Sequence, residues 1–253
     1  LHTCSEYIRT MPDDFEKLAK AFWPGPLTLV VDVCEEKIPN KVRAGLKSCA
    51  FRIPHHPVTR ELLKKTGPIV APSCNLSGKP SATSREHVEA DFGKDFPVLD
   101  EGPCSHGVES TICAFQNGSW KIARLGAISS EQLGQVLGYH PQLCIDPLKP
   151  ICPGQHFRHY APIAKLILIK TPWNAVKEKP TYVLGFSDRT YEGAENVVFL
   201  GSTKDPIEVA QNLYHNLRML DERNIDTAWV DLFLPEQGLW TTIKERLHKA
   251  SQV

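Results

Sequence analysis

Hydrophobic and polar positions along the first half of the chain predict an α/β domain. Apolar residues recur at helical spacing over 13–22 and at alternate positions over 27–33, which indicates a helix followed by a strand. Further strands are expected at 48–53, 68–71, 97–100, 111–115 and 120–124. Further helices are expected from Pro57 to Gly67, from a capping box at 83–86 to about residue 92, and from Ser129 to Gly138. This mixed order predicts a twisted mixed sheet.

The periodicity is cleaner in the last third of the chain. Strands are expected at 165–169, 181–186, 196–200 and 227–232, and helices at 206–223 and 241–250. This βα alternation predicts a small, largely parallel, three-layer domain of Rossmann-like type. It has no G-x-G-x-x-G segment, so no dinucleotide site is predicted.

Repeated prolines between the two patterns predict a linker. Proline interrupts helices and removes a backbone donor, and it recurs throughout 139–162. We therefore expect a first domain over residues 1–138, a linker loop over 139–162 and a second domain over 163–253.

Composition narrows the function classes. The 253 residues are 42% hydrophobic and 23% charged, as in globular proteins. The 29 Lys and Arg balance the 29 Asp and Glu, in both halves of the chain, which argues against a protein that coats nucleic acid. No apolar run approaches the ~20 residues of a membrane span, and the N-terminus lacks the pattern of a signal peptide. We expect a cytoplasmic protein without a membrane partner.

The 8 cysteines are scattered and form no C-x-x-C pair. This spacing does not indicate a zinc knuckle, and a chain of this length does not need a disulfide framework. Most of the thiols are expected to be small buried hydrophobes. Cys74 has no activating partner nearby in the sequence, so no nucleophilic role is assigned to it.

The polar segment Ala71–Thr83 carries the most chemistry in the sequence. It follows the strand expected at 68–71, which we interpret as buried, and offers serines, an asparagine, a glycine and a threonine before a helix. Hydroxyls and backbone N–H groups at the end of a strand suit a phosphate or a carboxylate. The same residue types also form ordinary turns, so both interpretations stay open.

Three other segments belong with this loop. Arg52 lies in the apolar stretch Ala50–Pro54, where a buried arginine needs either a protein carboxylate or a bound anion. Hydroxyls occur in Gly107–Ile112, and a further arginine begins Arg124–Ile128. The segment Ala21–Thr28 (A-F-W-P-G-P-L-T) is interpreted as a structural turn stiffened by two prolines.

Together these segments resemble the YrdC-like family of threonylcarbamoyl-adenylate synthases. The family's F-W-P-G-P-L-T, V-R-x-P-x-H-P, A-P-S-A-N-x-S-G-x-P-S-x-T, G-x-x-S-T-I and L-R-P-G-A-I segments have counterparts here, in that order. Residues 153–162 (P-G-Q-H-F-R-H-Y-A-P) are similar to the linker of the long two-domain form. The resemblance implies a YrdC-like catalytic domain and a cytoplasmic nucleotidyltransferase. Such an enzyme makes threonylcarbamoyl-adenylate from L-threonine, bicarbonate and ATP for transfer-RNA modification.

The resemblance also implies the binding residues. L-threonine would contact Arg52, Ser73 and Ser110. ATP would contact Ser48, Asn75, Thr83, Arg124, His159 and Tyr160. No catalytic side chain and no organic cofactor are implied, and Mg²⁺ would arrive with ATP. His156 and His159 lack the further ligands of a zinc site. Other transfer-RNA modification proteins would receive the product, and binding of transfer RNA itself is not required.

The sequence also departs from the family pattern. The P-T-E-T-x-Y-G-L and K-x-R segments are absent, so we expect a chain that begins after them and lacks phosphate contacts. Cys74 replaces an alanine, and Leu125 replaces a proline. Two alternatives follow: an inactive truncated homologue, or a module that binds RNA. An enzyme of hydrogenase maturation is disfavoured because its zinc-finger cysteine pairs and acylphosphatase-like segment are absent.

Overall fold

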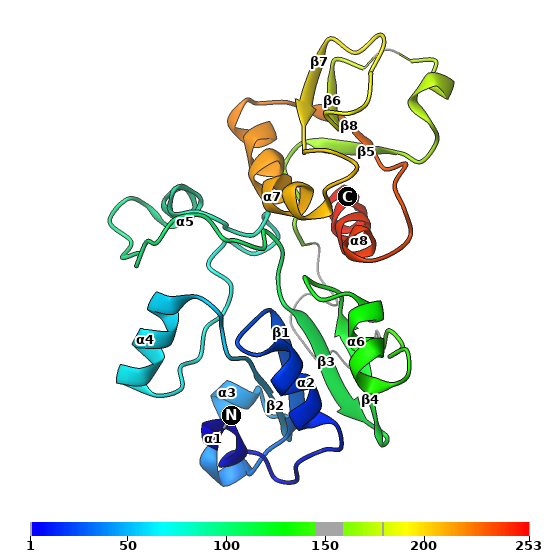
Figure 1. Ribbon diagram of the computed structural model, residues 1–253. Helices are drawn as coiled ribbons and strands as arrows, with labels where there is room; N and C mark the ends of the chain where they lie inside the picture. Colours follow the sequence, from blue (N-terminus) through cyan, green and yellow to red (C-terminus); the bar gives the residue numbers. More distant parts are fainter. Residues whose placement is uncertain (1, 145–158, 179, 253) are drawn as a thin grey trace. The chain divides into compact units, whose positions relative to one another are not determined.

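The structure is a computed structural model that describes residues 2–144, 159–178 and 180–252 (Figure 1). Its contacts divide the chain into two compact units. The first comprises Leu1–Pro72 and Glu109–His156, and the second comprises Ser73–Val108 and Phe157–Val253. The polar segment from Ser73 to Thr83 therefore groups with the C-terminal part of the chain. The domain boundaries drawn from the prolines stay a prediction.

The first unit contains the mixed sheet that the sequence predicts. Its strand order is β2-β1-β3-β4, where β1 (Leu27–Asp32) and β3 (Thr111–Gln116) are parallel. β2 (Ser48–Phe51) and β4 (Ser119–Arg124) are antiparallel to their neighbours. Asn117 and Gly118, both at positive φ, form the two-residue turn between β3 and β4, as expected for a tight hairpin.

Two helices pack over the main apolar core of the first unit. α2 (Phe15–Phe22) contacts α6 (Ser130–Leu137), and this core includes Phe15, Leu29, Trp120 and Leu133. A smaller, separate cluster consists of Val30, Ile112, Ala114 and Ala123. The other helical elements described in this unit are α1 (His2–Ser5), η1 (Glu35–Lys37), α3 (Asn40–Arg43) and α4 (Pro57–Thr66). The helix predicted from Ser129 begins with a capping box, because the Ser129 side chain accepts from the Gln132 N–H and the Ser129 N–H donates to Gln132 Oε1.

The second unit contains a fully parallel sheet of order β5-β8-β6-β7, in agreement with the prediction (Figure 1). The strands are β5 (Lys165–Ile169), β6 (Tyr182–Gly185), β7 (Asn196–Phe199) and β8 (Thr227–Asp231). The helical elements are α5 (Arg85–Phe92), η2 (Trp173–Ala175), α7 (Pro206–Glu222) and α8 (Leu239–Ser251). α7 contacts α8, and α7 buries the apolar side chains of Leu213 and Leu217.

Three predictions of regular structure were wrong, and so was the expected burial of most thiols, since Cys113 alone of the described cysteines is buried. Residues 68–71 form no strand, and Val70 is 68% exposed, because Pro68 and Pro72 lack the N–H groups that strand pairing uses. The segment 97–100 is also irregular, with Leu99 68% exposed. The N-cap of α5 is Ser84, whose side chain makes no capping bond, so the predicted capping box is not formed.

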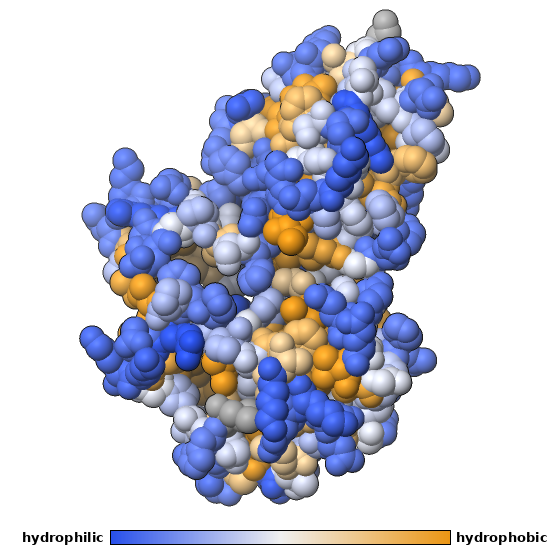
Figure 2. Space-filling view, viewed as in Figure 1, coloured by the Kyte–Doolittle hydropathy of each residue, from blue (hydrophilic) through white to orange (hydrophobic). Residues whose placement is uncertain are grey.

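Hydrophilic side chains cover most of the face seen in the space-filling view, and smaller hydrophobic areas lie between them (Figure 2). Such a mixture is normal for a folded surface. Over the described residues, no helix combines the length and the hydrophobicity that a membrane crossing requires.

Candidate substrate-binding residues

One end of the first sheet gathers Thr28, Ser110 and Arg124. Leu27 pairs with Thr111 in the parallel register, so Ser110 comes beside the start of β1. The buried hydroxyls of Thr28 and Ser110 lie 2.7 Å apart, at hydrogen-bond distance. Arg124, at the end of β4, donates from Nη2 to the Ser110 carbonyl at 2.8 Å and to its hydroxyl at 3.3 Å. Its buried Nε has no partner among the described residues, which leaves one donor for an anion.

Gly126 fixes the backbone of this cluster by close approach. A Cβ at this position would lie 2.3 Å from the Thr111 nitrogen and 2.4 Å from the Ser110 carbonyl carbon. The Ala127 N–H donates to Glu109 O at 3.0 Å, so the two segments run against each other. Only glycine fits here without moving Ser110. The sequence pattern did not assign a role to Gly126 or to Thr28.

Arg52 is exposed, in contrast to the buried position expected from its apolar neighbours. β2 ends at Phe51 and lies at the edge of the sheet, so Arg52 emerges beyond the paired residues. Its Nε donates to the Gly25 carbonyl at 3.0 Å, and the Gly25 N–H donates to Ile53 O at 2.8 Å. The proline turn interpreted as structural therefore also positions Arg52.

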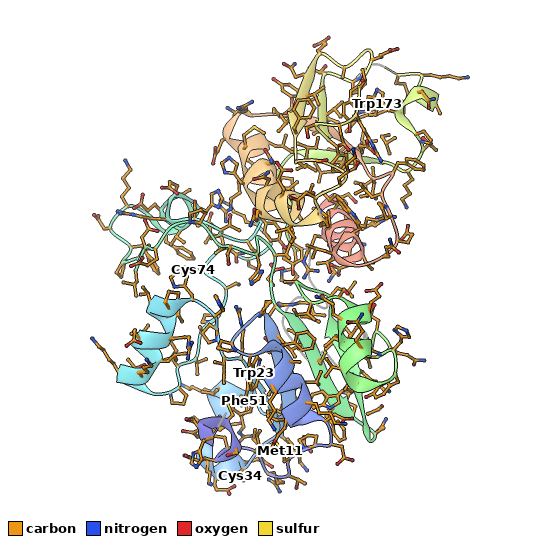
Figure 3. The ribbon with its side chains drawn as sticks, in the orientation of Figure 1. Met11, Trp23, Cys34, Phe51, Cys74 and Trp173 are labelled. Carbon is orange, nitrogen blue, oxygen red and sulfur yellow. The ribbon has the colours of Figure 1, made fainter. Side chains whose placement is uncertain are left out.

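Trp23 and Phe51 lie beside this turn and pack against the apolar core of the first unit (Figure 3). The Trp23 indole N–H donates to Leu27 O at 2.7 Å and ties the turn to β1. Ser48, by contrast, pairs with Asp32 at the opposite end of β2. In an extended strand, four residues separate Ser48 from Arg52 by roughly 13 Å.

The polar loop of the second unit is organised by Asn75. Its Nδ2 donates to the carbonyls of Leu76 at 2.9 Å and Lys79 at 3.2 Å, which closes the loop into a turn. Its Oδ1 is buried and has no partner among the described residues, so an acceptor is left for a donor group of a ligand. Ser73 is exposed at the start of the loop, and so is its neighbour Cys74. Cys74 is labelled in Figure 3.

Thr83 ends the polar loop and is buried against His87. The Thr83 N–H donates to His87 Nδ1 at 3.1 Å, and the Thr83 hydroxyl lies 3.3 Å from the same nitrogen. Burial, with smaller contributions from the charges of Arg218 and His215 in the same direction, lowers the pKa of His87 to about 4. The imidazole is therefore neutral at pH 7 and free to accept the Thr83 N–H at Nδ1.

The residues after the linker reach the same loop. The Ala161 N–H donates to Gly78 O at 2.9 Å. Tyr160 is buried at a φ of 65°, its ring stacks on Tyr214 at 5.4 Å, and the Arg246 guanidinium lies 4.8 Å from its centre. The His159 ring lies 5.6 Å from the Tyr160 ring. The second unit thus holds His159 and Tyr160 beside the polar loop.

Taken by unit, the predicted residues fall into two groups. The first unit carries Arg52, Ser110 and Arg124 toward one end of its sheet, with Ser48 at the other. The second unit carries Ser73, Asn75, Thr83, His159 and Tyr160. Across the described residues, no group of three or more His, Cys, Asp or Glu side chains could hold a metal ion. His156 lies outside the described residues.

Comparison with known proteins identifies the family. The family described as Telomere recombination matches residues 1–126. The family described as Threonylcarbamoyl-AMP synthase, C-terminal domain, matches residues 128–252. A threonylcarbamoyl-AMP synthase of Pyrococcus abyssi is 35% identical over 96% of this chain and 75% of its own length. The chain belongs to the threonylcarbamoyl-AMP synthase family.

Other members of the threonylcarbamoyl-AMP synthase family agree with this assignment. The Bacillus subtilis enzyme is 34% identical over 95% of this chain and 73% of its own length. The crystal structure of P. abyssi Sua5 complexed with L-threonine has a TM-score of 0.89 at 32% identity, covering 99% of this chain and 77% of that one. A P. abyssi Sua5 variant with a histidine and a tyrosine replaced by alanine gives a TM-score of 0.88. The α/β fold is therefore confirmed.

Proposed function

We propose that this protein is an L-threonylcarbamoyladenylate synthase. It forms threonylcarbamoyl-AMP and pyrophosphate from L-threonine, bicarbonate and ATP. The observation that carries the proposal is the agreement of 99% of the chain, at a TM-score of 0.89, with a synthase-family structure that holds L-threonine. The product would supply transfer-RNA threonylcarbamoyladenosine modification, through proteins that act after this one.

The chemistry suits the side chains present. The threonine amine adds to the carbon of bicarbonate, and loss of water leaves a carbamate. A carbamate oxygen then attacks the α-phosphorus of ATP, and the bond to the bridging oxygen of pyrophosphate breaks. This transfer needs charge neutralisation and positioning more than a protein nucleophile. Arginines, hydroxyls and a carboxamide meet that need, so no catalytic nucleophile is assigned.

Arg52, Ser73 and Ser110 are proposed to bind L-threonine. The guanidinium of Arg52 offers a planar fork to the threonine carboxylate. The hydrogen bond from its Nε to Gly25 O restricts the rotation of that fork. Ser110 would offer a hydroxyl that already lies 2.7 Å from Thr28 Oγ1, and Ser73 is exposed on the loop.

ATP is proposed to contact Ser48, Asn75, Thr83, Arg124, His159 and Tyr160. The unpartnered Nε of Arg124 suits a phosphate oxygen, and the unpartnered Oδ1 of Asn75 suits an amine or hydroxyl donor. The dipeptide His–Tyr occurs once in this sequence, at His159 and Tyr160, and a histidine and tyrosine were the residues replaced in the P. abyssi Sua5 variant. Mg²⁺ would be held by the ATP phosphates, as is usual for this ion.

Pyrophosphate release tests the proposal. The purified protein, at its full natural length, is supplied with ATP, and L-threonine or bicarbonate is omitted in turn. Release that requires both substrates supports the synthase, and Arg52→Gln should then raise KM for L-threonine. Arg60→Gln is the control, because Arg60 is an exposed arginine of α4 with no assigned role. Salt-sensitive RNA binding without ATP turnover would refute the synthase and favour a binding module.

A further inference from the structure

A buried ion pair joins α5 to α7 inside the second unit. The side chain of Asp91 is 0% exposed and that of Arg218 is 7% exposed. The pair is bidentate, with Arg218 Nη1 donating to Asp91 Oδ1 at 3.2 Å and Nη2 donating to Oδ2 at 2.7 Å. These two residues are 127 positions apart in the sequence, and one comes from the helix next to the polar loop. No motif in the sequence marked either of them.

Both members of the pair also bind the backbone of the polar loop. Asp91 Oδ2 accepts the Leu76 N–H at 3.2 Å, and Arg218 Nη2 donates to Pro80 O at 2.6 Å. Lys79 Nζ donates to Asp91 Oδ1 at 3.2 Å. The loop between Leu76 and Pro80 is therefore tied to the ion pair at three points. Asn75, the proposed ATP ligand, lies directly before the first of them.

A second contact between the same helices holds the other end of the loop. His87 lies four residues before Asp91, so both residues share one face of α5. The His87 ring stacks on His215 of α7 at 5.6 Å and accepts the Thr83 N–H at 3.1 Å. Side chains at the α5–α7 contact therefore bind the loop backbone near both of its ends, at Leu76 and at Thr83.

The charges of Asp91 and Arg218 are better explained by a role in positioning the loop than by a gain in folding stability. Burial works to raise the pKa of the Asp91 carboxyl, but hydrogen bonds from Arg218, the Leu76 N–H and Lys79 outweigh it and hold the pKa at about 2. A buried ion pair adds little stability over a well-packed apolar pair. The charged pair adds specific contacts to the loop, because Asp91 accepts from the Leu76 N–H and Lys79 Nζ, and Arg218 Nη2 donates to Pro80 O.

We propose that Arg218, acting through Asp91, is a positioning residue that orders the loop from Asn75 to Thr83 for ATP. This inference rests on the proposed function, which assigns both loop residues to the nucleotide. It also assigns to the C-terminal part of the chain a role in ordering the loop proposed to bind ATP. Arg218 is not expected to touch the substrates.

The test compares Arg218→Gln with Asp231→Asn. Asp231 is buried and also pairs with an arginine of the same unit, the half-buried Arg189, but it makes no described contact with the loop. Amide hydrogen exchange of peptides covering residues 75–83 reports the order of the loop without any ligand. Calorimetric titration with ATP reports the nucleotide site. If only a tenth of Arg218→Gln molecules keep the loop ordered, its Kd for ATP rises about tenfold.

The expected result is faster exchange over residues 75–83 and weaker ATP binding in Arg218→Gln, with neither change in Asp231→Asn. The inference is overturned if exchange over the loop is unchanged, if ATP binds Arg218→Gln as tightly as the natural protein, or if both variants change alike. A natural protein that does not bind ATP would instead refute the proposed function. Should Arg218→Gln not fold, Lys79→Met removes one loop contact, and the same two measurements should shift in the same direction by less.

Discussion

Replacement of Gly126 by alanine should disturb the Ser110 cluster directly. Gly126 does not require a positive φ, so the effect of the new methyl group is steric. The methyl carbon would lie 2.3 Å from the Thr111 nitrogen, 2.4 Å from the Ser110 carbonyl carbon and 2.5 Å from Glu109 O. All three are backbone atoms, so no side chain can rotate away. The strand start that presents the Ser110 hydroxyl has to shift by about 1 Å to restore normal contact.

We expect Gly126→Ala to lower the free energy of unfolding by about 3 kcal/mol, the upper part of the usual range for overpacking. For a chain of this size, that loss corresponds to a fall in Tm of roughly 6 to 12 °C. Gly134→Ala is the matched control. Gly134 lies within α6, and its methyl group would lie 3.0 Å from the exposed side chain of His140 and at an ordinary contact distance of 3.5 Å from Tyr139 O. Alanine favours a helix over glycine by about 1 kcal/mol, so the control should be neutral or stabilising.

The assay combines thermal unfolding followed by circular dichroism with KM for L-threonine, measured well below both melting temperatures. Gly126→Ala should show the lower Tm and a raised KM, because displaced Ser110 no longer meets its substrate. Gly134→Ala should change neither in that direction. For a chain of this size, 1 kcal/mol lowers Tm by at least about 2 °C. A Gly126→Ala protein whose Tm lies within 1 °C of that of the natural protein would therefore refute the steric argument.

Three further outcomes are expected. Thr28→Val should cost about 1 kcal/mol in urea unfolding and raise KM for L-threonine, because the Ser110 hydroxyl loses its hydrogen-bond partner at 2.7 Å. Thr28→Ser keeps a hydroxyl at this position and should leave both the stability and KM unchanged. The pKa of His87 is lower folded, about 4, than unfolded, so the unfolded chain binds more protons between pH 6.5 and 4. Stability should therefore fall by up to about 3 kcal/mol as pH drops through this window, and His87→Gln should flatten that part of the pH profile of unfolding. Leu133→Ala, in the core of the first unit, should cost about 2 to 5 kcal/mol in urea unfolding and leave KM for L-threonine unchanged.

The sequence predicted the regular elements best where an apolar pattern coincides with burial. The helix Pro206–Glu222 follows from the spacing of its apolar stripe, and the strand Leu27–Asp32 follows from an apolar run whose first five residues are all buried. The same rule was wrong at Ile69 and Val70, which are apolar but exposed. The run at 68–71 pairs with no described strand. Apolar residues alone do not show whether a partner strand is available.

The site was predicted as residue types and only in part as geometry. The motifs pointed to Ser110 and Arg124, which the structure joins by hydrogen bonds. Spacing placed Arg52 inside a strand, yet it lies just beyond an edge strand and is exposed. The ion pair of Asp91 and Arg218 could not be predicted, because its members are far apart in the chain and only tertiary packing brings them together.

The division of the chain into units has a consequence for how the polar loop is made. The loop that begins at Ser73 belongs to a compact unit whose remaining part begins at Phe157. A ribosome releases Asn75 and Thr83 long before it releases Arg218. During synthesis, every strand of the first unit's mixed sheet, from Leu27 to Arg124, is therefore available before the residue that anchors the loop has been made. A fragment cut at the boundary between the two family matches, near residue 127, would keep every residue of the loop and lose the helix that orders it.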